Sequence, residues 1–301
     1  MYNMDKLYEA VAQRGHVCVG LDTALEYVPE KEHRSSAAGS VLAYNRAIID
    51  AVIDIAACFK VQIACYEQMG INGLEAYATT LKYLRSKNAL VIADIKRGDI
   101  ADTASRYAHA HFQGEFEADF VTLNPYLGMD SLEPWLEYAD KKGKGAFVLM
   151  RTSNKGRNDF ECLKLGEGKR LYDAVGDKLT ELAATHSGKC GYGAFGAVVG
   201  ADPQSPEERE EAAAIRAGRP NLFFLIPGYG AQGGAATDAA LLLREGNGGV
   251  VNASRSIIKA WQNKANEADY AAADNNFAAW AARLAVLEMR DEILKASGRA
   301  K

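Results

Sequence analysis

The chain has 301 residues, which suits one large α/β barrel, and its 25% charged and 48% hydrophobic residues are typical of a globular protein. The formal net charge is −4 with Lys and Arg spread along the chain, which argues against nucleic-acid or anionic-membrane binding. No stretch has the apolar length of a membrane span or of a signal peptide. The five cysteines form no CxxC pair and no zinc-type cluster, so we expect reduced thiols in the cytoplasm.

Residues 1–15 mix charged and apolar side chains at helical spacing, which predicts an N-terminal helix. Beyond them, short apolar runs alternate with longer segments of helical periodicity, such as 40–57 and 166–186. This order of strand, helix and strand predicts a parallel sheet covered by helices. The predicted strands are HVCVGLD (16–22), CFKVQIA (58–64), ALVIADI (89–95), FVTLNPY (120–126), GAFVLMRT (145–152), GAVVGA (196–201), FFLIPG (223–228) and GGVVNAS (248–254).

The same alternation fits either a closed (β/α)8 barrel or a doubly wound open sheet, and the polar residues decide between them. Asp22, Lys60, Asp94, Asn124 and Ser153 all occur where a predicted strand ends. In a barrel these ends converge on one mouth. We therefore predict an α/β fold with a single TIM barrel and a parallel eight-stranded core.

No low-complexity linker interrupts the pattern, so we expect a single domain over residues 1–301. Near the C-terminus, residues 273–297 have a long amphipathic pattern. This pattern predicts a closing helix, packed outside the barrel or at a subunit contact.

The most informative segment is ALVIADIKRGDIADTA (89–104), where an apolar strand ends in Asp94, Ile95 and Lys96. Because side chains alternate across a strand, Asp94 and Lys96 point to one side and Ile95 points toward the helices. Both charges are therefore expected inside the barrel mouth. Taken alone, such a pair is equally well explained by a salt bridge that fills the barrel interior.

Neighbouring segments extend this charged group. Lys60 occupies the inner end of the preceding strand, and Asp22 ends the strand before that. An array of alternating sign is costly to bury unless something uses it, which favours a reaction centre. A glycine then permits a sharp turn, after which Asp99 can swing outward together with Ile100 and Thr103.

Three segments together resemble the orotidine 5′-phosphate decarboxylases, in particular their longer bacterial-type branch. They are DIKRGDIADTA (94–104), FKVQIACYEQMG (59–70) and VTLNPYLGMDSLEP (121–134), and the similarity extends over about residues 16–258. The resemblance implies an enzyme of de novo pyrimidine synthesis that converts orotidine 5′-phosphate to uridine 5′-phosphate and carbon dioxide. It also implies that the enzyme uses neither a metal nor a cofactor.

The resemblance further assigns roles to the charged residues. In the family, Asp99 is contributed by the neighbouring subunit, which implies a homodimer in which Ile100 and Thr103 also reach the neighbouring site. Asp22 would bind the sugar. The family's Lys-Asp-Lys-Asp tetrad maps onto Lys60, Asp94, Lys96 and Asp99.

A phosphate site is predicted after the last two strands. The segment IPGYGAQGG (226–234) is rich in glycine, and Arg255 begins a helix after the final strand. A glycine-rich turn is usually only a turn, but barrels commonly hold phosphate in these two loops, and an arginine suits that ligand. The resemblance assigns the substrate-binding residues of this region to Pro227, Gln232, Gly234, Ser254 and Arg255.

The segment MRTSNKG (150–156) offers hydroxyl and amide groups that could read the edge of a pyrimidine. From the residues alone, a local turn or a helix cap is the better interpretation. The resemblance instead assigns base recognition to Ser153, and places Asn124 among the substrate-binding residues. This chain has Lys155 where the longer bacterial members usually have proline.

Other functions fit the same pattern. A magnesium-dependent sugar-phosphate decarboxylase or aldolase on the same barrel would be sensitive to chelators. An aldolase could use Lys96 as a Schiff-base lysine, although Asp94 and Asp99 favour a charged ammonium instead. The chain could also be a non-catalytic nucleotide-binding homologue. The only observation against this alternative is that all four residues of the tetrad are present.

Overall fold

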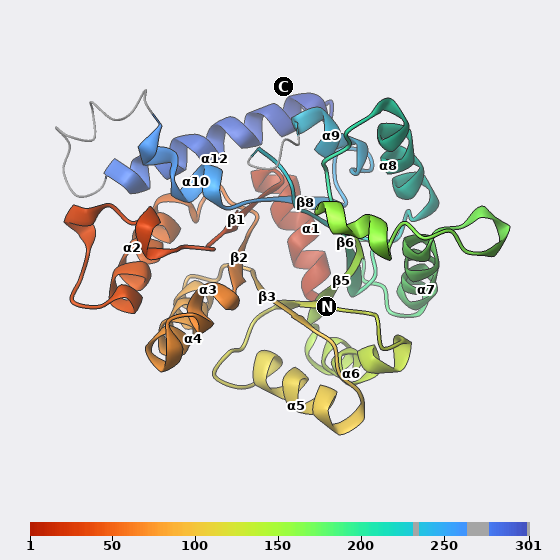
Figure 1. Cartoon of the computed structure of the whole chain (residues 1–301), viewed down its shortest axis with the longest axis horizontal. Helices are drawn as coiled ribbons and strands as arrows, with labels where there is room; N and C mark the ends of the chain where they lie inside the picture. Colours follow the sequence, from red (N-terminus) through yellow and green to blue (C-terminus); the bar gives the residue numbers. More distant parts are fainter. Residues whose placement is uncertain (231–234, 264–276, 300–301) are drawn as a thin grey trace.

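The computed structural model describes residues 1–230, 235–263 and 277–299. Within these residues, eight parallel strands pair in chain order and close into a barrel, with the last beside the first (Figure 1). The predicted TIM barrel is therefore confirmed, and each predicted run overlaps one strand. The strands are β1 (Val17–Gly20), β2 (Cys58–Gln62), β3 (Val91–Arg97), β4 (Phe120–Leu123), β5 (Gly145–Arg151), β6 (Phe195–Val199), β7 (Phe224–Ile226) and β8 (Gly249–Ala253).

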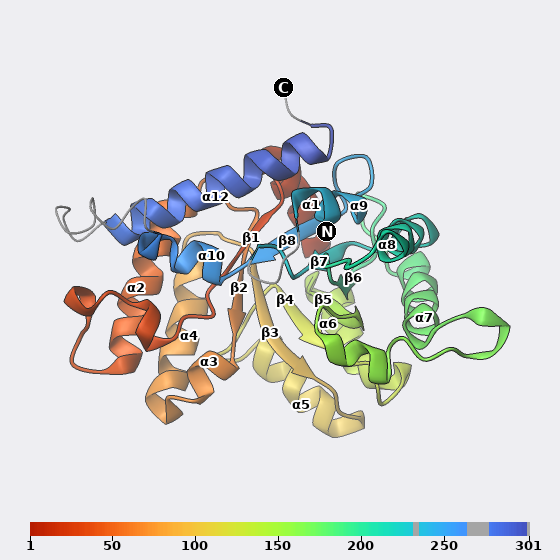
Figure 2. The same cartoon turned by 45° about the horizontal axis from the view of Figure 1, so that its top comes forward.

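Helices surround the strands, as Figures 1 and 2 show. The predicted helix over 166–186 begins later, at Leu171, because the Asp173 carboxylate accepts a hydrogen bond from the Arg170 N–H at 3.1 Å and caps the helix there. The helices are α1 (Asn3–Arg14), α2 (Ala37–Val52), α3 (Ala64–Glu67), α4 (Gly70–Ser86), α5 (Ala101–Phe112), α6 (Glu133–Lys142), α7 (Leu171–Thr185), α8 (Pro206–Gly218), α9 (Ala236–Leu241), α10 (Arg255–Ile258) and α12 (Phe277–Ala296). Short 3-10 turns are η1 (Leu25–Tyr27), η2 (Glu30–Glu32), η3 (Met129–Leu132), η4 (Lys155–Asp159), η5 (Gly166–Gly168) and η6 (Ala260–Gln262).

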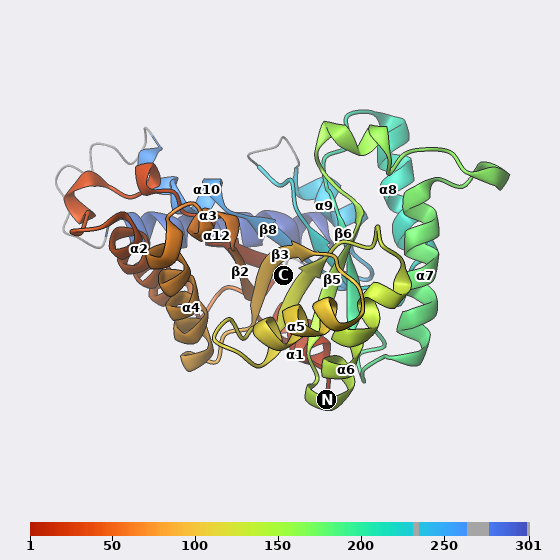
Figure 3. The same cartoon turned by 60° about the horizontal axis from the view of Figure 1, so that its bottom comes forward.

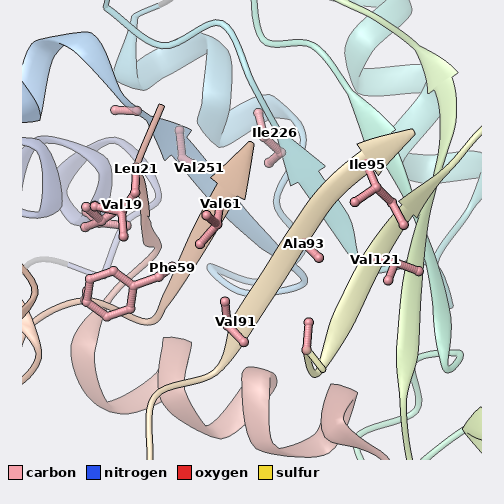
Figure 4. Close-up of a cluster of buried hydrophobic side chains, with 14 of the residues drawn as sticks. Val19, Leu21, Phe59, Val61, Val91, Ala93, Ile95, Val121, Ile226 and Val251 are labelled. Atoms are coloured by element: carbon pink, nitrogen blue, oxygen red, sulfur yellow. The ribbon is translucent and has the colours of Figure 1, made fainter. Parts of the chain in front are cut away.

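One set of alternating strand residues packs outward against the helices. Val19, Val61 and Ala93 are fully buried members of this layer, drawn in Figure 4. Ile95 belongs to the same apolar cluster, as predicted from its place between two charged residues. The outward-facing strand residues thus pack against the helices, and the inward-facing strand residues fill the interior of the barrel.

The inward residues near the amino ends of the strands form a second apolar cluster together with α1. Met4, Leu7 and Val11 of this helix are fully buried in that cluster, as are Phe120 and Phe147 from the strands. Figure 3 shows α1 beneath the strands, at one end of the barrel. The predicted N-terminal helix therefore closes that end, and the cavity described below lies at the opposite, carboxyl end.

The predicted C-terminal helix is present as α12, which packs against α2, α9 and β1. Its Arg283 side chain binds the Asp54 carboxylate at 2.5 Å and the Ala51 carbonyl at 2.6 Å. Residues 273–276 of the predicted segment lie outside the described residues. Neither α12 nor another helix in the described part of the chain is long and apolar enough to cross a bilayer.

Candidate active site

A cavity of about 520 Å³ lies at the carboxyl ends of the strands. Its walls come from segments between β1 and α10, so residues far apart in the sequence meet there. The predicted site residues that line it are Asp22, Lys60, Asp94, Lys96, Ser153, Pro227, Ser254 and Arg255.

The Asp94 carboxylate is the centre of the charged array. Its Oδ1 accepts hydrogen bonds from the Lys96 ammonium at 2.6 Å and from the Thr122 hydroxyl at 2.8 Å. Its Oδ2 accepts from the Lys60 ammonium at 2.8 Å and from the Gln62 amide at 3.0 Å. Asp94 is only 5% exposed, so these four donors replace the water that it loses on burial.

The charges of this array sustain one another. Burial by itself would raise the pKa of Asp94, but Lys60 and Lys96 outweigh that effect and hold this pKa well below its ordinary value. Burial would lower the pKa of Lys60, yet the carboxylates of Asp22 and Asp94 raise it well above its ordinary value. Asp94 and Lys60 are therefore both charged at neutral pH.

Lys96 is the member of the array that a ligand can reach most easily. Its side chain is 48% exposed, whereas those of Lys60 and Asp94 are 6% and 7% exposed. The backbone of Lys96 has a φ of 45°, which is uncommon for a residue with a side chain. The Thr122 hydroxyl accepts hydrogen bonds from the N–H groups of Ile95 and Lys96, each at 3.0 Å, and so supports this conformation.

Asp22 connects the charged array to the last strand. One of its carboxylate oxygens binds the Lys60 ammonium at 3.0 Å, and the other accepts a hydrogen bond from the Ser254 hydroxyl at 2.8 Å. Its side chain is 28% exposed, so Asp22 retains access to the cavity. The mouth thus contains two carboxylates that share the Lys60 ammonium.

The predicted phosphate region lies on the β7 and β8 side of the cavity. Arg255 is exposed at the first residue of α10, and Pro227 and Ser254 line the cavity beside it. Gln232 and Gly234 lie outside the described residues. The part of this region that is described therefore offers one guanidinium to a ligand.

The predicted base-recognition residue lies on another wall. Ser153 lines the cavity after β5. Its neighbour Thr152 is held by one carboxylate, because Glu161 accepts hydrogen bonds from the Thr152 N–H and hydroxyl, each at 2.8 Å. The Thr152 side chain beside Ser153 is thus engaged by Glu161, and Ser153 remains part of the cavity wall.

Four predicted residues do not line this cavity. The Asp99 carboxylate accepts a hydrogen bond from the Ile100 N–H at 2.9 Å, and Ile100 is 52% exposed at the start of α5. Thr103 is also exposed on α5. Asn124 uses its side-chain oxygen to accept a hydrogen bond from the Tyr126 N–H at 3.0 Å, which is a local turn.

Sequence reasoning missed several residues of the cavity. Gln62 and Thr122 hold Asp94 and are inward-facing polar residues at strand ends, so strand alternation could have found them. Tyr27 comes from η1 and Cys65 from the short helix α3, and neither element has a comparable sequence pattern. The cavity-lining residues that were not predicted are Tyr27, Gln62, Cys65, Thr122, Leu149, Thr152, Asn154, Val198, Leu225, Gly228, Tyr229, Asn252 and Ala253.

The low pKa of Asp94 predicts how stability depends on pH. The unfolded chain binds a proton at Asp94 near pH 4, and the folded chain does so only at lower pH. The stability that this carboxylate contributes is therefore complete above about pH 5 and is lost as the pH falls from there toward the folded pKa. We expect urea denaturation between pH 6 and pH 3 to give a steeper loss of unfolding free energy for the wild type than for Asp94→Asn. Equal slopes for the two proteins would contradict the assignment.

Comparisons with known proteins agree with the fold. The model of the Orotidine 5′-phosphate decarboxylase / HUMPS family matches residues 15–270. The orotidine 5′-phosphate decarboxylases of Clostridium perfringens and Clostridium acetobutylicum are 55% and 50% identical over 294 residues, covering 97% of this chain and 98% and 99% of theirs. The structure of Leishmania donovani OMP decarboxylase covers 100% of both chains with a TM-score of 0.75 and 30% identity. The chain belongs to the Orotidine 5′-phosphate decarboxylase / HUMPS family.

Proposed function

We propose that this chain decarboxylates orotidine 5′-phosphate to uridine 5′-phosphate and carbon dioxide. The observation that carries the proposal is the buried Asp94 carboxylate between the Lys60 and Lys96 ammonium groups, at the mouth of a barrel of this family. The two clostridial relatives, which are 55% and 50% identical to this chain, are orotidine 5′-phosphate decarboxylases. Their names support this reaction over other reactions of the same barrel.

In the proposed reaction, the bond between carbon 6 of the pyrimidine and its carboxylate carbon breaks and carbon dioxide leaves. The electron pair of that bond stays on carbon 6, and the Lys96 ammonium transfers a proton to it. Lys96 regains a proton from water before the next turnover. Asp94 lies beside the departing carboxylate, where the repulsion between the two negative charges falls as carbon dioxide leaves.

Fixed charges suit this reaction because a carbanion at carbon 6 is poorly delocalised by the ring. Enzymes of this kind require roughly 8 to 23 kcal/mol of transition-state stabilisation. Charges held in place before the reaction contribute without reorganisation, and Asp94 keeps Lys96 within 2.6 Å of itself in this structure. We propose that Lys60 and Asp99 hold Lys96 in place and contact the ribose hydroxyls, and that Asp22 also binds the sugar.

We propose that the reaction needs no metal ion. Both oxygens of Asp94 accept hydrogen bonds from ammonium groups, so Lys60 and Lys96 occupy the positions that a divalent cation would take on this carboxylate. Lys60 likewise binds Asp22. The alternative is a magnesium-dependent sugar-phosphate enzyme. Such an enzyme would lose its activity on chelation, so a chelation experiment distinguishes the two.

We also propose a homodimer in which Asp99, Ile100 and Thr103 reach the neighbouring site. Asp99 lies outside the cavity of its own chain, as a residue that acts on a second site would. Large apolar side chains are exposed in the segments that follow β3 and β4: Ile100 is 52%, Tyr126 81% and Leu127 49% exposed. Exposed apolar groups of this size support a subunit contact beside the mouth.

The substrate's other groups would bind on the remaining walls. We propose that Arg255 binds the phosphate, since a guanidinium can bind phosphate oxygens in a bidentate manner. Gln232 and the amides of Gly234 and Ser254 would assist it, with Pro227 beside them. Ser153 would recognise the base. Asn124 is a weaker candidate, because its side chain is engaged in a turn.

The first prediction about the reaction concerns Lys96 and metal independence. After exhaustive chelation, we expect the wild type to consume orotidine 5′-phosphate, followed by its absorbance. Lys96→Ala should lose at least about 10³-fold in kcat, because it lacks both the proton donor and the charge near carbon 6. Binding of uridine 5′-phosphate should stay measurable in the variant.

Lys82→Ala, which removes an exposed lysine of α4, is the matched control and should retain full activity. Turnover by Lys96→Ala at the wild-type rate would refute the role of Lys96. Activity that disappears on chelation and returns with magnesium would favour the sugar-phosphate alternative.

The second prediction concerns the phosphate. Arg255→Ala should lower kcat/KM, mainly through a higher KM, because the phosphate loses a charge-assisted partner. The loss should correspond to about 2 to 5 kcal/mol of transition-state stabilisation. Steady-state kinetics with orotidine 5′-phosphate measure this effect. Arg46→Ala, which removes an exposed arginine of α2, should leave KM unchanged. An unchanged KM in Arg255→Ala would exclude Arg255 from the phosphate site.

The third prediction concerns Asp99. Lys96→Ala and Asp99→Ala subunits, co-expressed with different affinity tags, can be purified as heterodimers. If Asp99 acts on the neighbouring site, one site of each heterodimer carries both substitutions and the other carries neither. We therefore expect about half of the wild-type activity per dimer, although each homodimer is inactive. A heterodimer as inactive as its parents would place Asp99 in the site of its own subunit.

A further inference from the structure

A second group of charged residues lies behind the Ser153 wall of the cavity, between the segment after β5 and helix α8. Arg157, in η4, is 6% exposed and places one guanidinium nitrogen 2.9 Å from the Asp202 carboxylate. Its other terminal nitrogen is 3.0 Å from the Glu208 carboxylate of α8. Asp202 is also 6% exposed. One buried guanidinium therefore joins three segments that are separate in the sequence.

Further ion pairs join the end of β5 to helix α8 at the same place, which we call the junction. Arg151, at the end of β5, is 1% exposed and approaches the Glu211 carboxylate of α8 at 3.5 Å. The pairing of β5 with β6 shifts its register just before this residue. Buried arginines of this kind are costly unless their partners are held in place, so the geometry of the junction is narrowly determined.

This junction is connected directly to Ser153. The guanidinium nitrogen of Arg157 that binds Asp202 also lies 3.5 Å from the Ser153 carbonyl, and the Arg157 N–H donates to the Asn154 carbonyl at 3.1 Å. On the other side, Ser153 packs against Gly200, where an added Cβ would lie 2.9 Å from the Ser153 Cα. The position of Ser153 in the cavity wall therefore depends on where Arg157 is held.

The residues between Ser153 and Arg157 supply little rigidity of their own. Asn154, Lys155 and Gly156 are all exposed. A proline at position 155 would fix its own φ and restrict the residue before it, and lysine does neither. The ion pairs of Arg157 therefore restrain this turn, together with the 2.6 Å contact between the Thr152 hydroxyl and the Asn154 side-chain oxygen.

We propose that Arg157, paired with Asp202 and Glu208, is a positioning residue for recognition of the pyrimidine base. It holds the Ser153 turn against the cavity, so that Ser153 meets the base without a further ordering cost when the nucleotide binds. This inference rests on the proposed function, because it takes Ser153 as the residue that contacts the base. It assigns no role to Arg157 in binding the phosphate or the sugar.

The test compares two ligands that differ by the base. Uridine 5′-phosphate contains base, ribose and phosphate, whereas ribose 5-phosphate lacks the base. In Arg157→Met, we expect calorimetry to give a dissociation constant for uridine 5′-phosphate that rises roughly tenfold or more, and one for ribose 5-phosphate that stays unchanged. Arg170→Met is the matched control, since it removes an arginine bound to Glu211 in the same cluster and should leave both constants unchanged.

Arg157→Met leaves a buried Asp202, so circular dichroism must establish that the variant folds. The double variant Arg157→Met/Asp202→Asn removes both buried charges and should show the same selective loss. Equal weakening of both ligands, or a wild-type preference for uridine 5′-phosphate in the folded variants, would overturn the proposal. Failure of the proposed function would instead be visible in the wild type, as an absence of decarboxylation.

Discussion

The arrangement of this protein depends on one buried carboxylate. Asp94 is almost removed from water, and a charge in that position is tolerated only when its partners surround it. Those partners come from β2, β3 and β4, so the charge is compensated only after three strands have paired in their correct register. The closed barrel provides that pairing. The same compensation leaves the Lys96 ammonium at the cavity surface, where it can act on a bound molecule.

The two ends of the barrel differ in composition: one end is packed with apolar side chains, and the other end contains the cavity. At the amino ends of the strands, α1 and the inward aromatic residues form an apolar cluster. At the carboxyl ends, charged and polar residues line the cavity together with a few apolar ones such as Leu149 and Leu225. A chain that placed Asp94 or Lys60 one layer lower would bury these charges among Phe120 and Phe147. The apolar floor therefore directs the charged groups to the mouth.

The cavity also separates binding from reaction. Arg255 lies on the β7 and β8 side, whereas Asp94 and Lys96 come from β3. Binding energy from a remote phosphate can offset the unfavourable approach of a substrate carboxylate to Asp94, which is how such a site would gain in rate. Ser153 stands on a third wall, supported from behind by Arg157. Each of these walls thus comes from a different part of the chain and would contact a different part of the substrate.

The sequence by itself determined the eight strands, the barrel and the family, because hydrophobic periodicity and the motif around Asp94 are local patterns. The convergence of parallel strand ends in a barrel also predicted that Asp22, Lys60, Asp94 and Lys96 line one cavity, and the family resemblance added Ser153, Pro227, Ser254 and Arg255. Only the tertiary structure decided that Thr122 and Gln62 hold Asp94, because inward polar residues acquire partners through the register of neighbouring strands. It also decided the pairing of Arg157 with Asp202, 45 residues apart, because no periodicity relates a turn after one strand to the loop after the next.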